Sequence, residues 1–134
     1  GKLVRWWVWS TTVILLLCVV AATVNSMQEK HDLAQRAAAM TQGDPQRGVS
    51  LVETHGCVGC HVIPGLRGAR GQVGPSLDGF ANRVYIGGVI TNSPDFLRQW
   101  LLDPHTIDEK SAMPSVGLTD QEARDVAAFL YTLD

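Results

Sequence analysis

Apolar residues form one long run near the start of the chain. Residues 6–24 read WWVWSTTVILLLCVVAATV, and only one serine and three threonines interrupt the apolar pattern. As a helix rising about 1.5 Å per residue, residues 3–24 reach about 33 Å, and the hydrocarbon core of a bilayer is about 30 Å thick. The pattern therefore predicts one membrane-spanning helix, which we assign to residues 1–25.

The residues at the start of this run indicate how it crosses a membrane. Lys2 and Arg5 flank one end, and three tryptophans cluster beside them within residues 6–9, where indoles favour the headgroup boundary. Because the positive end of such a helix stays in the cytoplasm, we expect a cytoplasmic N-terminus and an external remainder. A cleaved secretory signal, cut within residues 21–26, is the alternative, but the apolar run is long for a signal.

Helix-forming and helix-capping residues divide the rest of the chain. Residues 26–42 contain neither glycine nor proline, and they predict a helical stalk, assigned to residues 26–43, that continues the membrane helix. Asp44 followed by Pro45 predicts a new helix with the aspartate as its N-cap. From residue 44 to residue 134 we expect one domain of short helices and long loops, so the fold class is all-α.

Three further helices are expected in this domain. A short one is assigned to residues 76–82. A longer helix begins at Ser93-Pro94 and ends at Asp103-Pro104, because proline fits the first turn of a helix and stops one at its end. The last covers residues 119–133 and begins with a T-x-x-E capping box.

The composition limits what the domain can be. The chain has 134 residues, a formal net charge of −2, 46% hydrophobic residues and 18% charged residues. There is no basic surplus that would indicate nucleic acid binding. A domain of about ninety residues buries too little apolar surface to be more than marginally stable, so a cofactor is expected to complete the core.

The segment Cys57-Val58-Gly59-Cys60-His61 indicates which cofactor this is. Two thiols on one helical turn can add to the two vinyl groups on one edge of a haem, and the adjacent imidazole then lies under the iron as proximal ligand. A zinc site and a thiol–disulfide exchange pair are the alternatives. Zinc needs two more ligands, yet the third cysteine, Cys18, lies in the apolar run. An exchange pair would follow a strand, but a polar helix is predicted here. We therefore expect one covalently attached haem c.

A second axial ligand separates an electron carrier from a haem that binds a substrate. Met27 and Met40 lie in the stalk, whereas Met113 lies in a loop and is followed by a proline that stiffens the backbone. A thioether favours Fe(II), so ligation by His61 and Met113 raises the reduction potential. Core packing by Met113 and ligation by His105 are the alternatives.

Residues 44–133 resemble a class I cytochrome c. The resemblance rests on Cys57–His61, Gly74-Pro75-Ser76-Leu77, Ala112-Met113-Pro114 and the apolar end of the last helix, in this order. It implies short helices and loops wrapped around one haem. It also implies that the Pro75 carbonyl accepts the Nδ1–H of His61. We expect the apolar face of the haem to be buried against residues that include Leu77.

Four other residues are expected to contact the haem. The resemblance implies that Arg83 and Trp100 donate hydrogen bonds to the propionates, with help from Tyr85 or Asn92. Tyr85 and Trp100 are also expected to cover the apolar face. Plain core packing of Trp100 and a solvated surface charge at Arg83 are the alternatives.

Residues 83–114 are similar to the cytochrome c domain fused to the second subunit of some haem–copper cytochrome c oxidases. The residues shared with that group occur in the same order: Arg83, Gly88, Asn92 with Pro94, Trp100 and Met113-Pro114. The chain departs from the group in having one predicted membrane span instead of two and no Cys/His/Met cluster for a binuclear copper centre. The resemblance therefore implies a free-standing, tethered counterpart that serves the same oxidase.

These observations predict a monohaem cytochrome tethered to the bacterial cytoplasmic membrane, with its haem domain in the periplasm. It would carry single electrons from a quinol-oxidising complex or dehydrogenase to a terminal cytochrome c oxidase. With His61 and Met113 on the Fe(III)/Fe(II) centre, no small-molecule substrate binds, and the protein is not an enzyme. No nucleic acid partner is expected.

Three alternatives remain at this point. The first is a fixed haem subunit of a membrane oxidase or dehydrogenase. The second is a haem sensor or enzyme whose iron has an open position, and the third is a structural module without haem. Co-purification, carbon monoxide binding and the visible spectrum separate them.

Overall fold

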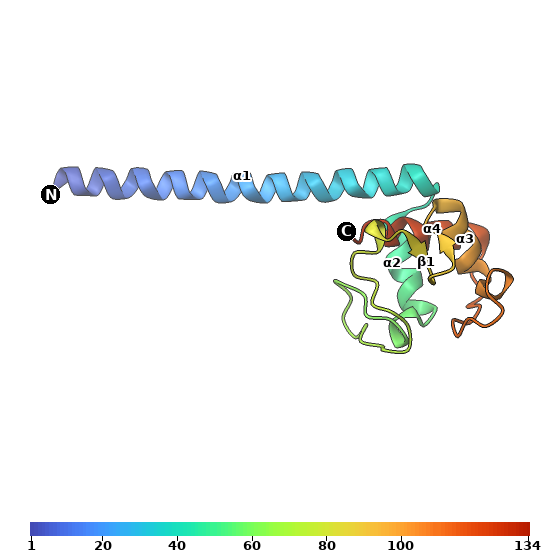
Figure 1. The fold of residues 1–134 in the computed structure, drawn as a ribbon. Coiled ribbons are helices and arrows are strands. Elements are labelled where there is room, and N and C mark those ends of the chain that lie inside the picture. The colour runs from blue at the N-terminus through green and yellow to red at the C-terminus, as the bar shows by residue number, and fades with distance from the viewer. The chain divides into compact units, whose positions relative to one another are not determined.

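The computed structural model describes all 134 residues as two compact units, Gly1–Asp32 and Leu33–Asp134 (Figure 1). The elements along the chain are α1 (Lys2–Thr41), α2 (Pro45–Thr54), η1 (Cys57–Gly59), η2 (Phe80–Asn82), β1 (Tyr85–Ile86), β2 (Ile90–Thr91), α3 (Pro94–Leu102), η3 (Pro104–Thr106) and α4 (Asp120–Leu130). The η elements are single 3₁₀ turns. The mostly helical fold confirms the expected class.

The first unit is the apolar part of α1, and its side chains are exposed throughout. By length and composition α1 is the one helix that could cross a membrane, with a mean hydropathy of 2.1 over its most apolar 18 residues. The hydroxyls of Ser10, Thr11 and Thr12 donate to backbone carbonyls one turn earlier, so these polar groups are satisfied within the helix.

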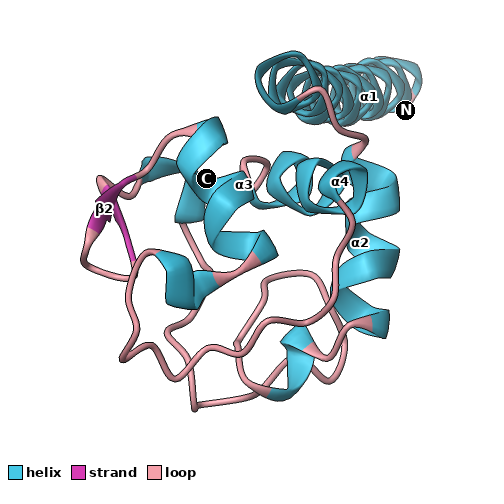
Figure 2. Cartoon of the chain, turned by 90° about the vertical axis from the view of Figure 1, so that its right-hand side faces the viewer, coloured by secondary structure: helices cyan, strands magenta, loops and turns pink.

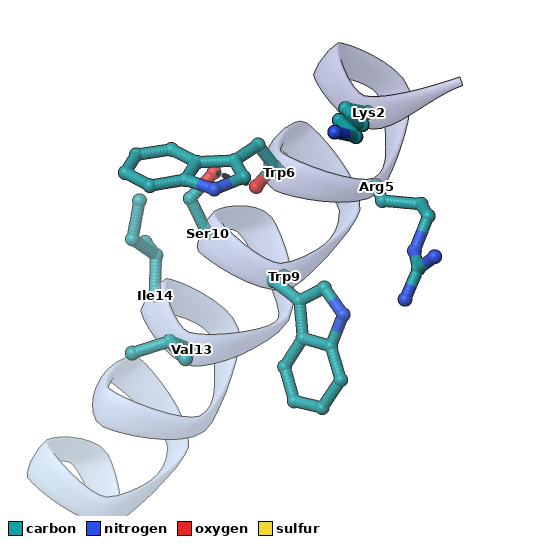
Figure 3. Close-up of a pocket in the computed structure, with 7 residues that line it drawn as sticks. All are labelled: Lys2, Arg5, Trp6, Trp9, Ser10, Val13 and Ile14. Carbon is teal, nitrogen blue, oxygen red and sulfur yellow. Dashed lines mark hydrogen bonds between the residues drawn. The ribbon is translucent and has the colours of Figure 1, made fainter.

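One face of α1 combines cationic and aromatic side chains. Figure 3 shows Lys2 and Arg5 near the start of the helix, followed by Trp6 and Trp9 along it. Residues 6–9 include three tryptophans that are each more than two-thirds exposed. Such side chains are typical of a helix end at a membrane interface.

The second unit is built around the contact of α2 with α4. A Cβ on Gly48 of α2 would lie 2.8 Å from the Cβ of Phe129 and 2.8 Å from the carbonyl carbon of Asp125. Glycine therefore lets the two helices approach closely. The core also contains Leu97 and Trp100 of α3, and Figure 2 shows α3 and α4 close together with long loops beside them.

Local capping chemistry begins the three short helices as predicted. The Asp44 carboxylate accepts from the N–H of Gln46 at 2.9 Å, and Ser93 accepts from the N–H of Phe96 at 3.3 Å. In α4 the hydroxyl of Thr119 accepts from the N–H of Glu122, whose carboxylate accepts the N–H of Thr119. Each cap satisfies backbone donors that a helix leaves free at its start.

Three local expectations differ from the structure. Only the end of the helix expected at residues 76–82 forms, as the single turn η2. A two-stranded antiparallel hairpin, β1 with β2, forms where only helices and loops were expected, because Gly87 and Gly88 both adopt positive φ and turn the chain back. The last helix ends at Leu130 rather than Leu133.

The buried carboxylate of Asp125 joins three parts of the second unit. It is 1% exposed and accepts the backbone N–H of Asp44 at 2.8 Å, just before α2. Gln121 donates both to Asp125 and to the carbonyl of Gln42, directly after α1. Hence α4 holds the end of α1 and the start of α2 together.

Gly48→Ala tests the close approach of α2 and α4. The new methyl group overlaps backbone of α4, so we expect the free energy of unfolding to fall by roughly 3 kcal/mol. Urea unfolding of the haem-loaded protein measures this. Gly59→Ala is the matched control, because a Cβ there would meet nothing within 4 Å. Equal stabilities of the two variants would contradict the packing argument.

Candidate functional site

The Cys57–His61 motif begins just after α2. That helix ends at Thr54, so it does not continue into the motif. Gly56 adopts a φ of 80°, and the 3₁₀ turn η1 begins at the next residue. The N–H groups of Cys60 and His61 both donate to the carbonyl of Cys57, at 3.2 and 3.0 Å. The two thiols and the imidazole are therefore held by one tight turn.

These side chains open into a cavity of about 370 Å³ in the second unit. Nine of the ten residues predicted for the site line it, and they are Cys57, Cys60, His61, Pro75, Leu77, Arg83, Tyr85, Trp100 and Met113. The open groove beside Trp6 and Trp9 on α1 is larger, at about 680 Å³, but it contains no thiol or imidazole (Figure 3). The chemistry of the site belongs to the cavity.

The imidazole of His61 has a fixed orientation. Its Nδ1 lies 2.7 Å from the Pro75 carbonyl oxygen, which can only accept, so Nδ1 carries the proton and Nε2 is left with a free lone pair. A Cβ on Gly74 would lie 2.7 Å from Nδ1, so only glycine lets the backbone pass this close to the ring. This arrangement suits a metal ligand, whose second nitrogen is usually held by a carbonyl or carboxylate.

No disulfide joins the two motif cysteines. Burial raises the pKa of Cys57, and the neighbouring Cys60 adds to the rise. Before a cofactor is attached, the Cys57 side chain is therefore a neutral thiol at neutral pH. A thioether forms when the S–H of such a thiol adds across the double bond of a vinyl group, so two thiols on one turn fit one edge of a haem.

Met113 lies in the same cavity and is partly buried. The indole N–H of Trp100 donates to its sulfur, with Nε1 and Sδ 3.1 Å apart. The resemblance implied a haem propionate as the partner of this N–H. In the structure this N–H donates to the thioether, because the end of α3 brings the indole to the loop that carries Met113. A propionate contact of Trp100 stays a prediction. Tryptophan has only this one donor.

The hydrogen bonds of Asn92 differ from those that the resemblance implied. Asn92 does not line the cavity. Its amide group donates to the carbonyls of Phe80 and Arg83, and its oxygen accepts from the hydroxyl of Tyr131 at 2.7 Å. Burial raises the pKa of Tyr131 to about 12, so this hydroxyl keeps its proton at neutral pH. Asn92 thus stabilises the protein around the cavity, and none of its N–H groups is free for a propionate.

Arg83 and Tyr85 lie at the edge of the cavity. The guanidinium of Arg83 donates to the carbonyls of Ser76 and Asp78 and lies over the ring of Phe80. Tyr85 is 58% exposed. Both side chains remain candidates for contact with a polar edge of a bound cofactor.

A family model described as cytochrome c matches residues 45–134, about two-thirds of the chain. The chain belongs to the cytochrome c family. It carries haem c, attached through the Cys57 and Cys60 thioethers of its CxxCH motif, and its role is haem-based electron transfer.

Two curated relatives of the cytochrome are cytochrome c oxidase subunit 2 proteins. The one from Alkalihalophilus pseudofirmus is 27% identical over 88 residues, which cover 65% of this chain and 25% of the relative. The one from Bacillus sp. strain PS3 is 28% identical over 81 residues, 58% of this chain and 23% of the relative. The match thus spans about a quarter of each relative's length. No solved structure matches the chain.

Sequence reasoning missed part of the cytochrome's site. The loop before Met113 lines the cavity through Asp108, Lys110 and Ser111, which belong to no helix or strand. The contact of Trp100 with Met113 was also missed. Trp100 lies three residues before Asp103-Pro104, where the helix ends. This position near the end of the helix was a signal that its indole could contact the following loop.

Trp100→Phe tests the role of the indole N–H. Phenylalanine keeps an aromatic ring but donates no hydrogen bond to sulfur, so a Met113 thioether bound to the haem iron would become a better ligand for Fe(III). We expect the reduction potential to fall by about 40 mV, since a neutral hydrogen bond contributes about 1 kcal/mol and 59 mV is a factor of ten for one electron. Redox titration measures the shift. The sulfur-to-iron charge-transfer band should also shift, whereas a donor to a propionate would leave that band unchanged.

Proposed function

We propose that the cytochrome is a membrane-tethered carrier of single electrons whose haem iron is bound by His61 and Met113. One observation carries this proposal. A single cavity brings together the two thiols of the motif, an imidazole with its Nε2 free, and a partly buried thioether. The nine predicted residues around it, mostly apolar, suit a large flat cofactor.

The haem supplies one-electron chemistry by cycling between Fe(III) and Fe(II). The residues of this chain hold it in a fixed setting. Cys57 and Cys60 attach it, the Pro75 carbonyl orients His61, and the N–H of Trp100 orients the Met113 thioether. With His61 and Met113 both holding the iron, no small molecule would need to reach it. We therefore propose an electron carrier rather than an enzyme.

The direction of electron flow is proposed from the relatives. Both are subunits of cytochrome c oxidase by their names, so we take a terminal oxidase as the acceptor and a quinol-oxidising complex or dehydrogenase as the donor. Residues 44–134 contain seven Lys and Arg residues and eleven Asp and Glu residues, a formal charge of 7 − 11 = −4. This acidic surplus suits docking on basic faces of the partners.

The apolar part of α1 serves as the tether in this proposal. Lys2 and Arg5 precede the apolar run, so the N-terminus lies in the cytoplasm of a bacterium and the haem domain in the periplasm. A tether confines carrier and partners to one surface, and the high local concentration makes weak, short-lived contacts sufficient.

A fixed subunit of an oxidase or dehydrogenase complex is the second candidate. The three tryptophans in residues 6–9 are exposed on α1, and together they offer a large aromatic surface to a neighbouring membrane protein.

Met113→Ala tests the proposed ligation. Alanine leaves the sixth position of the iron open, so we expect loss of the sulfur-to-iron charge-transfer band, carbon monoxide binding to the ferrous protein, and a potential lower by on the order of 100 mV. Met40→Ala is the matched control, because Met40 is exposed on α1. If the wild-type protein already binds carbon monoxide and Met113→Ala changes neither spectrum nor potential, the ligation is refuted.

Solubilisation of native membranes in mild detergent separates a carrier from a subunit. A carrier is expected to elute apart from the oxidase on size exclusion, yet to reduce the oxidase faster when both are returned to one membrane. Constant stoichiometry with an oxidase or dehydrogenase through purification would instead establish the fixed subunit.

A further inference from the structure

The segment that carries Met113 is tied on both sides to the end of α3. Asp103 caps this helix, and its carboxylate oxygen Oδ1 accepts from the hydroxyl of Ser115 at 2.8 Å. Nε2 of His105 lies 3.1 Å from the carbonyl oxygen of Ser111 and donates to it, since a carbonyl only accepts. The residues two positions before and two positions after Met113 are thus both held.

Asp103 is the centre of this arrangement. The same Oδ1 accepts the backbone N–H of His105 at 3.1 Å and lies 3.4 Å from its Nδ1. The hydrogen bond from Ser115, followed by that from the His105 backbone, lowers the pKa of Asp103. The carboxylate is therefore ionised at neutral pH and keeps its full capacity to accept these donors.

The tie matters because no regular secondary structure holds the segment in place. Residues 107–119 contain no helix or strand. The backbone N–H of Met113 donates to the hydroxyl of Ser111 at 3.2 Å, and its sulfur accepts from Trp100. The end of α3 and the turn η3 that follows thus contact the sulfur and both flanks of its loop.

We propose that Asp103 and His105 are positioning residues that hold the Met113 loop so that its thioether stays bound to the haem iron. They act through Ser111 and Ser115 and touch neither the sulfur nor the site of the haem. This inference rests on the proposed ligation by Met113, and it adds the residues that set how firmly the ligand is held.

The test is an imidazole titration of the ferric, haem-loaded full chain. Imidazole binds only when the thioether leaves the iron, so its apparent dissociation constant reports the ratio of Met-bound to Met-free protein. For Ser115→Ala and for His105→Ala we expect this constant to fall about tenfold, which is about 1.4 kcal/mol, with a weaker sulfur-to-iron charge-transfer band.

Two variants separate positioning from general loss of structure. His105→Gln retains a side-chain N–H for the Ser111 carbonyl, so it should recover part of the imidazole resistance that His105→Ala loses. Thr106→Ala is the matched control, because Thr106 in the same turn donates to the backbone carbonyl of Asp103 and contacts neither flank of Met113. It should bind imidazole as the wild type does.

A double variant tests whether Ser115 acts through Asp103. Asp103→Ala with Ser115→Ala should bind imidazole no more tightly than Asp103→Ala alone, because both changes remove one bond. If Asp103→Ala does not fold, Ser115→Ala and His105→Gln decide the matter, since both side chains are exposed.

The outcomes distinguish this inference from the proposed function. Wild-type affinities and spectra in Ser115→Ala and His105→Ala, with Met113→Ala changed as predicted, would overturn the positioning role alone. An unchanged Met113→Ala would overturn the ligation and the inference together. A tenfold effect in Thr106→Ala would show that the turn acts generally and would also overturn the specific role of Asp103 and His105.

Discussion

The hydrogen bond from His61 to the Pro75 carbonyl is the contact on which the site depends. It spans 14 residues and exists only because the intervening loop returns to the motif, where the N–H of Gly74 donates to the carbonyl of Cys60 at 2.8 Å. Backbone passes so close to the ring that any side chain on Gly74 would collide with it. The path of the loop therefore fixes both the orientation of the His61 ring and the position of its proton on Nδ1. As a consequence, the Nε2 of His61 is free in the cavity.

The second half of the site is organised by a different element, the end of α3. Trp100 on that helix reaches the sulfur of Met113, and the helix is buried against α4 through Leu97 and Leu101. In turn, α4 packs on α2, which precedes the cysteines. The two candidate ligands thus come from separate loops, but each loop rests on a helix of the same core. This suits a carrier, because rigid supports limit rearrangement when the charge on the iron changes.

The burial of Asp125 shows how three segments of the second unit are held together. A carboxylate that is 1% exposed needs hydrogen bonds, and it receives them from Gln121 and from the backbone just before α2. Nothing in the sequence distinguishes this residue from Asp120, which lies five residues earlier in the same helix and is exposed. The role of Asp125 arises from helix packing, which places the end of α1 and the start of α2 against α4.

Local chemistry was readable from the sequence. The helix starts at Asp44-Pro45, Ser93-Pro94 and Thr119 involve bonds across two or three residues, and the length of the apolar run and the spacing of the Cys57–His61 motif are equally local. The partners of single polar groups were not readable. The N–H of Trp100 donates to Met113, 13 positions away, and Asn92 accepts from Tyr131, 39 positions away. The partner of each group depends on which groups the packed core brings within about 3 Å of it. That distance cannot be inferred from the spacing of residues along the sequence.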